Sequence, residues 1–203
     1  KTFTKDMKVL LCKKKANCRL VNNIPEEVTI LDEENLTFLP KAIKNPVEVE
    51  NERIAHIKDG VALTKFIYWL KKNAGNIPMT ELSAEEKLYS FRAQQENFIG
   101  NSFDPIISYG VHAAINHYSA TPETDISIEP GNFLLADTGG HYYEGTTDTT
   151  RTVAIGSVND EQKKYFTAVL RGMLNLGNAK FRHGCTGVNL DYLARSPLWE
   201  LGQ

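Results

Sequence analysis

Apolar residues recur at a helical period after Asn45-Pro46, and this pattern is the clearest structural signal in the chain. From residue 46 to Asn73 the apolar positions form a wide stripe, which predicts a long helix packed on more than one side. Proline suits the first helical turn because its missing N–H would have no partner there. The stretch from Ala74 to Pro78 breaks the pattern and predicts the end of the helix.

A second helix is predicted shortly afterwards. Ser83 and Glu86 have the spacing of a capping box, in which two side chains satisfy backbone N–H groups at a helix start, so we expect a helix from there to about Asn97. From Phe98 to Gly156 the period shortens towards two, and glycine or proline separates runs rich in aromatic and β-branched residues. That stretch predicts an antiparallel sheet.

Helical periodicity returns near the end of the sequence. Asn159 and Gln162 predict another helix cap before an amphipathic segment, and a last helical stretch is expected near residues 190–202. Residues 1–40, in contrast, hold short apolar pieces between polar stretches, which is typical of the end of a domain. Helices, then strands, then helices predict an α+β fold in residues 41–203, with a domain boundary near residues 41–46.

Composition narrows the class of protein. The chain has 203 residues, of which 41% are hydrophobic and 24% charged, as in ordinary soluble proteins and unlike disordered or fibrous ones. The longest apolar run, Phe66 to Leu70, is far below the roughly 20 residues that span a bilayer, so no membrane partner is expected. With 23 basic and 25 acidic residues, nucleic acid is not expected as a partner either. The 3 cysteines form no C-x-x-C pair, which favours a reducing, cytoplasmic location.

Two aspartates near glycine-rich turns are the main candidates for chemistry. Asp137 ends an apolar strand on the face of Phe133 and Leu135, where a carboxylate without a partner would be costly. Asp148 begins the next strand, so we expect both carboxylates on adjacent antiparallel strands within diagonal reach. Two hard oxygen ligands on a rigid sheet suit one or two divalent cations. The alternative is structural: Asp137 caps a turn, and Asp148 pairs with Arg151.

His117 is the third candidate. It lies beside a turn at residues 119–122, where an imidazole near metal-bound water could hold a substrate group or move a proton at neutral pH. Taken alone, such a histidine is more often structural. The remaining histidines are interpreted as structural: His56, His112, His141 and His183. Because the sequence has no nucleophile elbow, P-loop or dinucleotide-binding motif, the residues alone lead only to an α+β protein with a candidate metal site.

Four segments, taken in order, add a more specific indication. They are residues 55–63, residues 102–108, Ile115-Asn-His-Tyr118 with Thr121-Pro-Glu123, and Asp137-x-Gly-Gly through Gly145-Thr-Thr-Asp148-x-Thr-Arg-Thr152. In this order they resemble the Xaa-Pro aminopeptidases (aminopeptidase P), metallopeptidases of the pita-bread fold. The resemblance runs over residues 41–203, and residues 1–40 resemble the end of the preceding domain. It implies helices packed on one side of a curved antiparallel sheet, incomplete at the C-terminus.

The resemblance also implies a chemistry. In this family two divalent ions, usually manganese, share a bridging water or hydroxide that attacks the peptide carbonyl before proline. By resemblance Asp137 would chelate one metal ion, Asp148 would bridge both, and His117 would bind the substrate near the scissile bond without binding metal. Arg151 would support Asp148. The implied partners are peptides with proline in the second position, and the resemblance leaves a homodimer of the complete protein open.

The sequence also departs from the family pattern. His112 and Asn116 replace the residues common there, so the rim near His117 is expected to differ. In relatives, a glycine-rich segment with a metal-ligand histidine follows the stretch that ends at Gly202, and glutamate ligands come later. The remaining metal ligands would therefore lie beyond Gln203, and the chain by itself is expected to be inactive.

Two other functions remain as alternatives. One is a catalytically dead pita-bread protein that serves as a binding module, and the presence of Asp137, Asp148 and His117 together argues against it. The other is a prolidase or methionine aminopeptidase on the same fold, which the Thr-Thr-Asp-x-Thr-Arg and His-Tyr motifs disfavour.

Overall fold

The computed structural model describes residues 3–4 and 6–203, and the chain divides into two compact units, Lys1–Asn51 and Glu52–Gln203. The first unit contains a parallel pair of short strands together with two short helices. These elements are β1 (Lys8–Leu10), α1 (Cys18–Asn22), β2 (Thr29–Leu31) and α2 (Phe38–Ala42). The two strands coincide with apolar pieces of the sequence, which explains why only short elements form there.

Two helices precede the sheet of the second unit in the sequence. Helix α3 (Pro46–Asn73) begins and ends where the apolar stripe predicted. Helix α4 (Glu81–Arg92) begins earlier than the sequence predicted, because its capping box is formed by Thr80 and Ser83 and not by Ser83 and Glu86, and it ends at Arg92, before the expected end near Asn97. The Thr80 hydroxyl accepts from the Ser83 N–H at 3.2 Å, and the Ser83 hydroxyl accepts from the Thr80 N–H at 2.8 Å.

The predicted antiparallel sheet is present, although it is divided into two parts. Its strands are β3 (Phe98–Asn101), β4 (Ile106–Tyr109), β5 (Asn132–Thr138), β6 (Gly140–Tyr142) and β7 (Thr149–Ile155). Strands β4, β5 and β7 form one sheet in the order β4-β5-β7, and β3 pairs with β6; every pairing is antiparallel. A 3-10 helix, η1 (Gly110–Ala114), follows β4 and starts the long connection to β5.

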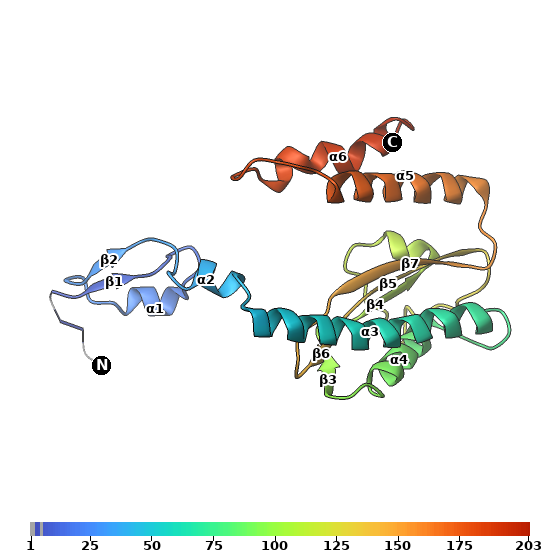
Figure 1. Cartoon of the computed structure of the whole chain (residues 1–203), viewed down its shortest axis with the longest axis horizontal. Helices are drawn as coiled ribbons and strands as arrows, with labels where there is room; N and C mark the ends of the chain where they lie inside the picture. Colours follow the sequence, from blue (N-terminus) through green and yellow to red (C-terminus); the bar gives the residue numbers. More distant parts are fainter. Residues whose placement is uncertain (1–2, 5) are drawn as a thin grey trace. The chain divides into compact units, whose positions relative to one another are not determined.

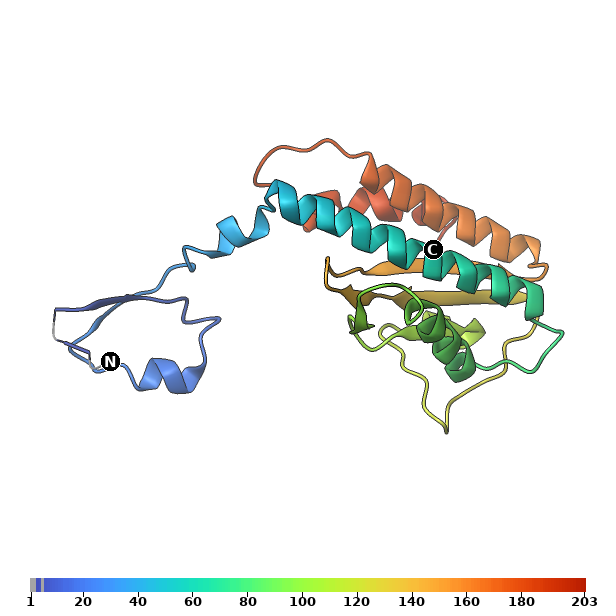
Figure 2. The ribbon, with the colours of Figure 1, turned by 60° about the horizontal axis from the view of Figure 1, so that its bottom comes forward.

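Helices α3 and α4 pack on one face of the β4-β5-β7 sheet (Figures 1 and 2). Apolar side chains from these helices and from alternate strand positions form one core. Its members include Leu63, Phe66, Leu70, Leu88, Ile107, Leu134, Ala136, Val153 and Ile155. Two helices packed on one face of an antiparallel sheet confirm the α+β class predicted from the sequence.

The last two helices lie side by side (Figure 2). Helix α5 (Asp160–Gly177) has the predicted capping box of Asn159 and Gln162. Helix α6 (Gly187–Trp199) begins slightly before the predicted stretch, because Thr186 supplies its N-terminal cap. The start of α5 contacts the start of β5, where Phe166 stacks on Phe133 with ring centroids 5.3 Å apart.

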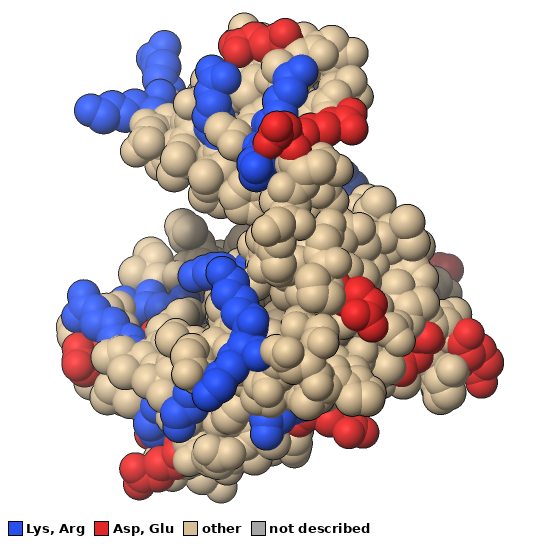
Figure 3. Space-filling view, turned by 90° about the vertical axis from the view of Figure 1, so that its right-hand side faces the viewer, with Lys and Arg blue, Asp and Glu red and all other residues tan. Residues whose placement is uncertain are grey.

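The surface carries charges of both signs. On the face shown in Figure 3, basic and acidic side chains are interspersed, and uncharged surface lies between them. All 3 cysteines are free. Within the part of the chain that the structure describes, no helix combines the length and the apolar character needed to cross a membrane.

Candidate functional site

Strand β5 presents two different faces. Leu134, Ala136 and Thr138 point to the α3–α4 side and are fully buried. Asp137 shares the other face with Leu135, as the sequence predicted, but this face is only half-buried. The carboxylate of Asp137 has the partner that the sequence called for, the hydroxyl of Thr150. Both faces of the strand are apolar in sequence, so the alternation alone did not show which face the helices cover.

The two aspartates occupy neighbouring strand ends. The register of the sheet pairs Asp137 with Thr150, and the Thr150 hydroxyl donates to Asp137 Oδ1 at 2.8 Å. Asp148 directly precedes β7, so it lies one residue outside the strand that it was expected to begin. Continued alternation places Asp148 on the face of Thr150, diagonal to Asp137. The expected pairing of the two strands is confirmed, because β5 and β7 are direct neighbours in the sheet. In the sequence, the short strand β6 lies between them.

The structural alternative for these aspartates does not hold. Asp148 is exposed, and its carboxylate makes no hydrogen bond or ion pair with any residue that the structure describes. Arg151, its expected partner, donates instead to the backbone oxygen of Thr150 at 2.8 Å. This follows from the alternation of the strand, which puts residues 148 and 151 on opposite faces. Asp137 bonds across the sheet and does not cap a turn.

A glycine fixes the turn between the two aspartates. A Cβ atom on Gly139 would lie 2.0 Å from the backbone oxygen of Thr147 and 2.2 Å from the hydroxyl oxygen of Ser102. Ser102 donates to that same Thr147 oxygen at 2.8 Å, and the Gly140 N–H donates to the Thr147 hydroxyl at 2.9 Å. Only a residue without a side chain allows this close approach of the two backbones.

A buried ion pair supports the same strand end from the other face. Arg92 and Asp59 have side chains 1% and 3% exposed, with Nε–Oδ1 and Nη2–Oδ2 distances of 2.7 Å and 3.2 Å. Arg92 also donates to the hydroxyl of Thr138, next to Asp137, at 2.9 Å. The Tyr142 hydroxyl donates to Asp59 at 3.1 Å, and burial, followed by the charge of Asp59, raises the pKa of this tyrosine. Helices α3 and α4 thus hold the end of β5.

His117 reaches the same region from the connection after β4. It has a φ of 57°, a left-handed conformation that is uncommon outside glycine, and it is exposed. A hollow of about 290 Å³, here called the site pocket, is lined by Ile106, Ala113, Ile115, Asn116, His117, Leu135, Asp137 and Thr150. Two of the candidate residues, His117 and Asp137, therefore border one pocket, whereas Asp148 is not among its lining residues.

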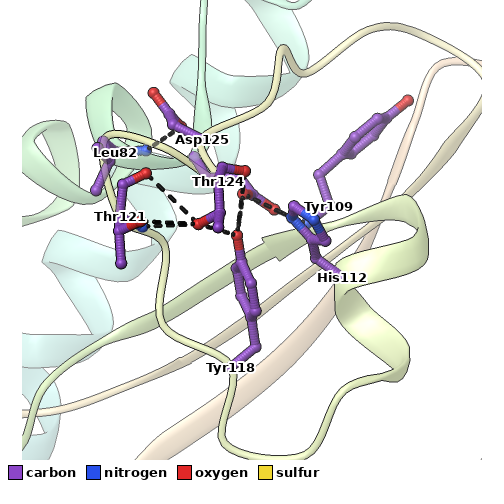
Figure 4. A network of polar contacts seen from close by, with 8 residues as sticks. Leu82, Tyr109, His112, Tyr118, Thr121, Thr124 and Asp125 are labelled. Atoms are coloured by element: carbon purple, nitrogen blue, oxygen red, sulfur yellow. Dashed lines mark hydrogen bonds and ion pairs between the residues drawn. The ribbon is translucent and has the colours of Figure 1, made fainter.

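Sequence reasoning missed a buried carboxylate beside this pocket. Glu81, the first residue of α4, is 0% exposed and accepts hydrogen bonds from Tyr109, His112 and Tyr118. Figure 4 labels these three partners. No motif marked Glu81, because its partners lie 28–37 positions away. His112, interpreted as structural, contacts this carboxylate and not the site pocket.

The donors at the site suit a hard cation. Asp137 and Asp148 offer carboxylate oxygens on one sheet face, and Asp137 Oδ1 is oriented by Thr150. Within residues 3–4 and 6–203, no group of 3 or more His, Cys, Asp or Glu is arranged to hold a metal ion. The two aspartates therefore fit a divalent metal in ligand type, as part of a larger ligand set.

This fold and site define a class of protein. The chain belongs to metallopeptidase family M24, whose profile matches residues 50–203. Solved structures agree: the X-prolyl aminopeptidase of Caenorhabditis elegans, described as a cytosolic enzyme with a di-nuclear active site, superposes with a TM-score of 0.79 at 35% identity over 88% of this chain and 29% of its own. The X-Pro aminopeptidase of Thermotoga maritima gives a TM-score of 0.73 at 26% identity, over 97% of this chain and 54% of its own. The pita-bread fold expected from the sequence is confirmed.

Curated relatives with similar sequences are named as aminopeptidases P. Aminopeptidase P1 of Arabidopsis thaliana is 40% identical over 185 residues, which cover 81% of this chain and 29% of the relative. A probable Xaa-Pro aminopeptidase P of Paracoccidioides brasiliensis is 44% identical over 164 residues, which cover 80% of this chain and 27% of the relative. The chain therefore spans under a third of the length of these relatives.

Proposed function

We propose that this chain is part of a metal-dependent aminopeptidase that hydrolyses the peptide bond between an N-terminal residue and a following proline. The observation that carries the proposal is the site pocket, which His117 and Asp137 both line. Asp148 directly precedes β7, the strand that pairs with the strand of Asp137. The identity of 40–44% to relatives named aminopeptidase P supports this specificity.

The aspartates would hold the metal ions. Asp137, fixed by Thr150 and by the turn at Gly139, would chelate one ion, and Asp148, exposed and without a protein partner among the described residues, would bridge two. Two divalent ions, for which we propose manganese, would supply an activated water and would stabilise developing negative charge. The di-nuclear site and cytosolic location of the Caenorhabditis elegans enzyme support two ions and a cytoplasmic location.

His117 would bind the substrate. Its imidazole is exposed at the pocket rim and bonds to no residue that the structure describes, so both ring nitrogens are available to a peptide. Ile106, Ile115 and Leu135 give the pocket an apolar wall that suits the nonpolar part of a peptide. We therefore assign His117 a role in holding the peptide beside the metal ions and not a role as a metal ligand.

The test compares two variants of the complete protein, Asp148→Asn and His117→Ala. Metal content is measured on both purified proteins, and Asp160→Asn serves as control because the Asp160 side chain is 98% exposed at the start of α5. We expect Asp148→Asn to lose manganese, and His117→Ala to keep manganese but hydrolyse Xaa-Pro peptides slowly. Equal loss of metal in both variants would contradict the assigned roles.

Substrate class is tested separately. The wild-type complete protein, loaded with manganese, is assayed with Xaa-Pro-Xaa tripeptides, Xaa-Pro dipeptides and matched peptides with alanine in place of proline. Release of the first residue from proline tripeptides supports the proposal. Cleavage restricted to dipeptides would indicate a prolidase, and no cleavage with retained metal would indicate a binding module.

A further inference from the structure

We propose that Glu81 is a positioning residue, whose buried carboxylate holds the segment Tyr109–Tyr118 and thereby places His117 at the rim of the site pocket. The inference rests on the proposed role of His117 in substrate binding and adds a residue outside the pocket that determines its geometry. Glu81 itself does not line the pocket, so its effect must pass through the segment that it holds.

Glu81 makes all of its side-chain hydrogen bonds to that segment. Its Oε1 accepts the backbone N–H of Tyr109 at 2.7 Å, and its Oε2 accepts the hydroxyl of Tyr118 at 3.1 Å. His112 Nδ1 lies 3.1 Å and 3.0 Å from the two oxygens. One carboxylate therefore contacts the beginning, the middle and the end of the segment.

Burial makes these contacts strong constraints. Glu81 is 0% exposed, and a buried carboxylate that loses its donors is strongly destabilised, so the three donors are held to it. Tyr118 is 9% exposed, and burial raises the pKa of its phenol, which keeps the hydroxyl a donor. The His112 ring stacks on the Tyr118 ring with centroids 4.3 Å apart, which fixes the two side chains relative to each other.

His117, in contrast, has no such support of its own. It is exposed, has a φ of 57°, and bonds to no residue that the structure describes. A left-handed conformation in a residue other than glycine persists only where its surroundings impose it. The neighbouring Tyr118, held by Glu81 and by the Thr124 hydroxyl at 3.1 Å, supplies that constraint.

The same segment forms much of the pocket wall. Ala113, Ile115, Asn116 and His117 all line the pocket and lie between the two tyrosines that Glu81 holds. Loosening the carboxylate contacts would therefore displace His117 and this wall together. Asp137 and Asp148 would remain in place, because the sheet and the Gly139 turn hold that part of the site.

The first readout needs no substrate. In the complete protein, Glu81→Gln keeps the side-chain shape but removes the charge, and Glu86→Gln is a matched control because Glu86 is exposed on the same helix. We expect hydrogen exchange of the amides of residues 110–117 to rise at least about tenfold in Glu81→Gln and to stay unchanged in the control. Unchanged exchange in Glu81→Gln would overturn the proposal. If that variant fails to fold, Tyr118→Phe, which keeps the stacked ring and loses one bond, is judged by the same result.

The second readout is kinetic. If Glu81 acts through His117, Glu81→Gln lowers kcat on an Xaa-Pro-Xaa tripeptide by about tenfold in the wild-type background and by less than about twofold in His117→Ala, with metal content unchanged. Fully additive losses would refute positioning through His117. A wild-type protein that cleaves no Xaa-Pro peptide would refute the proposed function alone, and the exchange result would still decide the role of Glu81.

Discussion

The buried pair of Asp59 and Arg92 allows a quantitative prediction about the strand that carries Asp137. Replacing Arg92 by methionine keeps an apolar stem of similar length but removes the guanidinium. Among the described residues, Asp59, with a side chain 3% exposed, then retains only the Tyr142 hydroxyl as a partner at 3.1 Å. Thr138 also loses the donor that binds its hydroxyl at 2.9 Å.

The expected cost follows from this geometry. Removing one partner of a buried ion pair destabilises a protein by about 3–5 kcal/mol, since the other charge is left without compensation. The double variant Asp59→Asn/Arg92→Met removes both charges, and the desolvation of an unpaired carboxylate no longer contributes. We therefore expect the double variant to be more stable than Arg92→Met alone, although still below wild type, because the Thr138 hydroxyl loses the Arg92 donor in both.

The measurement is the free energy of unfolding of the complete protein from urea titration, for wild type, both single variants and the double variant. Glu86→Gln is the control for handling and mutation as such. A loss below about 1 kcal/mol in Arg92→Met, against the 3–5 kcal/mol expected, would refute the reasoning. So would a double variant less stable than Arg92→Met, since removal of the stranded charge could then not be a gain.

Three further outcomes are expected. Gly139→Ala should destabilise by about 1–3 kcal/mol or more and weaken metal binding, because its Cβ would lie 2.0 Å from the Thr147 oxygen; wild-type metal content and stability would contradict this. Asn159→Ala should cost about 1 kcal/mol in urea unfolding by removing the cap of α5, and no change would show that the cap contributes nothing. Hydrogen bonds from Lys58 and then Asn97 lower the pKa of Glu144 below its ordinary value of 4.5. The contribution of the ionised Glu144 side chain to stability is therefore complete above about pH 4.5 and is lost as the pH falls through the lowered pKa. Glu144→Gln should therefore reduce stability at about pH 7 but not at about pH 2, and an equal loss at both would contradict the assignment.

The sequence predicted elements best where their ends carried local signals. Helix α3 was located at both ends because Pro46 and the break after Asn73 are local features of the chain. The start of α4 was misplaced because a Thr80–Ser83 pair satisfies the same backbone groups as the Ser-x-x-Glu pattern, so two overlapping signals competed. The packed face of β5 could not be predicted, because apolar residues occupy both faces of this particular strand.

The candidate site was predictable to the extent that strand pairing determines it. Asp137 and Asp148 flank a turn between antiparallel strands, and that spacing alone brings the strands together. The position of His117 in the same pocket as Asp137 depends on the long connection between β4 and β5 and on the unusual φ of His117, which no spacing rule predicts. The role of Glu81 could not be predicted for the same reason, because its partners belong to another part of the chain and contact it only through tertiary packing.

The three candidate residues differ in how firmly this chain holds them. Asp137 is bonded to Thr150 on its own face, while Arg92 holds the adjacent Thr138 on the opposite face, so both faces of β5 are fixed at that point. His117 is held only indirectly, through Tyr118 and Glu81. Asp148 has no side-chain partner among the described residues, and its backbone is placed by the hydrogen bonds of Thr147 to Ser102 and Gly140 and by the start of β7. Because a free carboxylate next to a rigid turn can rotate at little cost, the Asp148 oxygens in the proposed metal site would take their position from the bound ions, whereas Asp137 is already oriented by the fold.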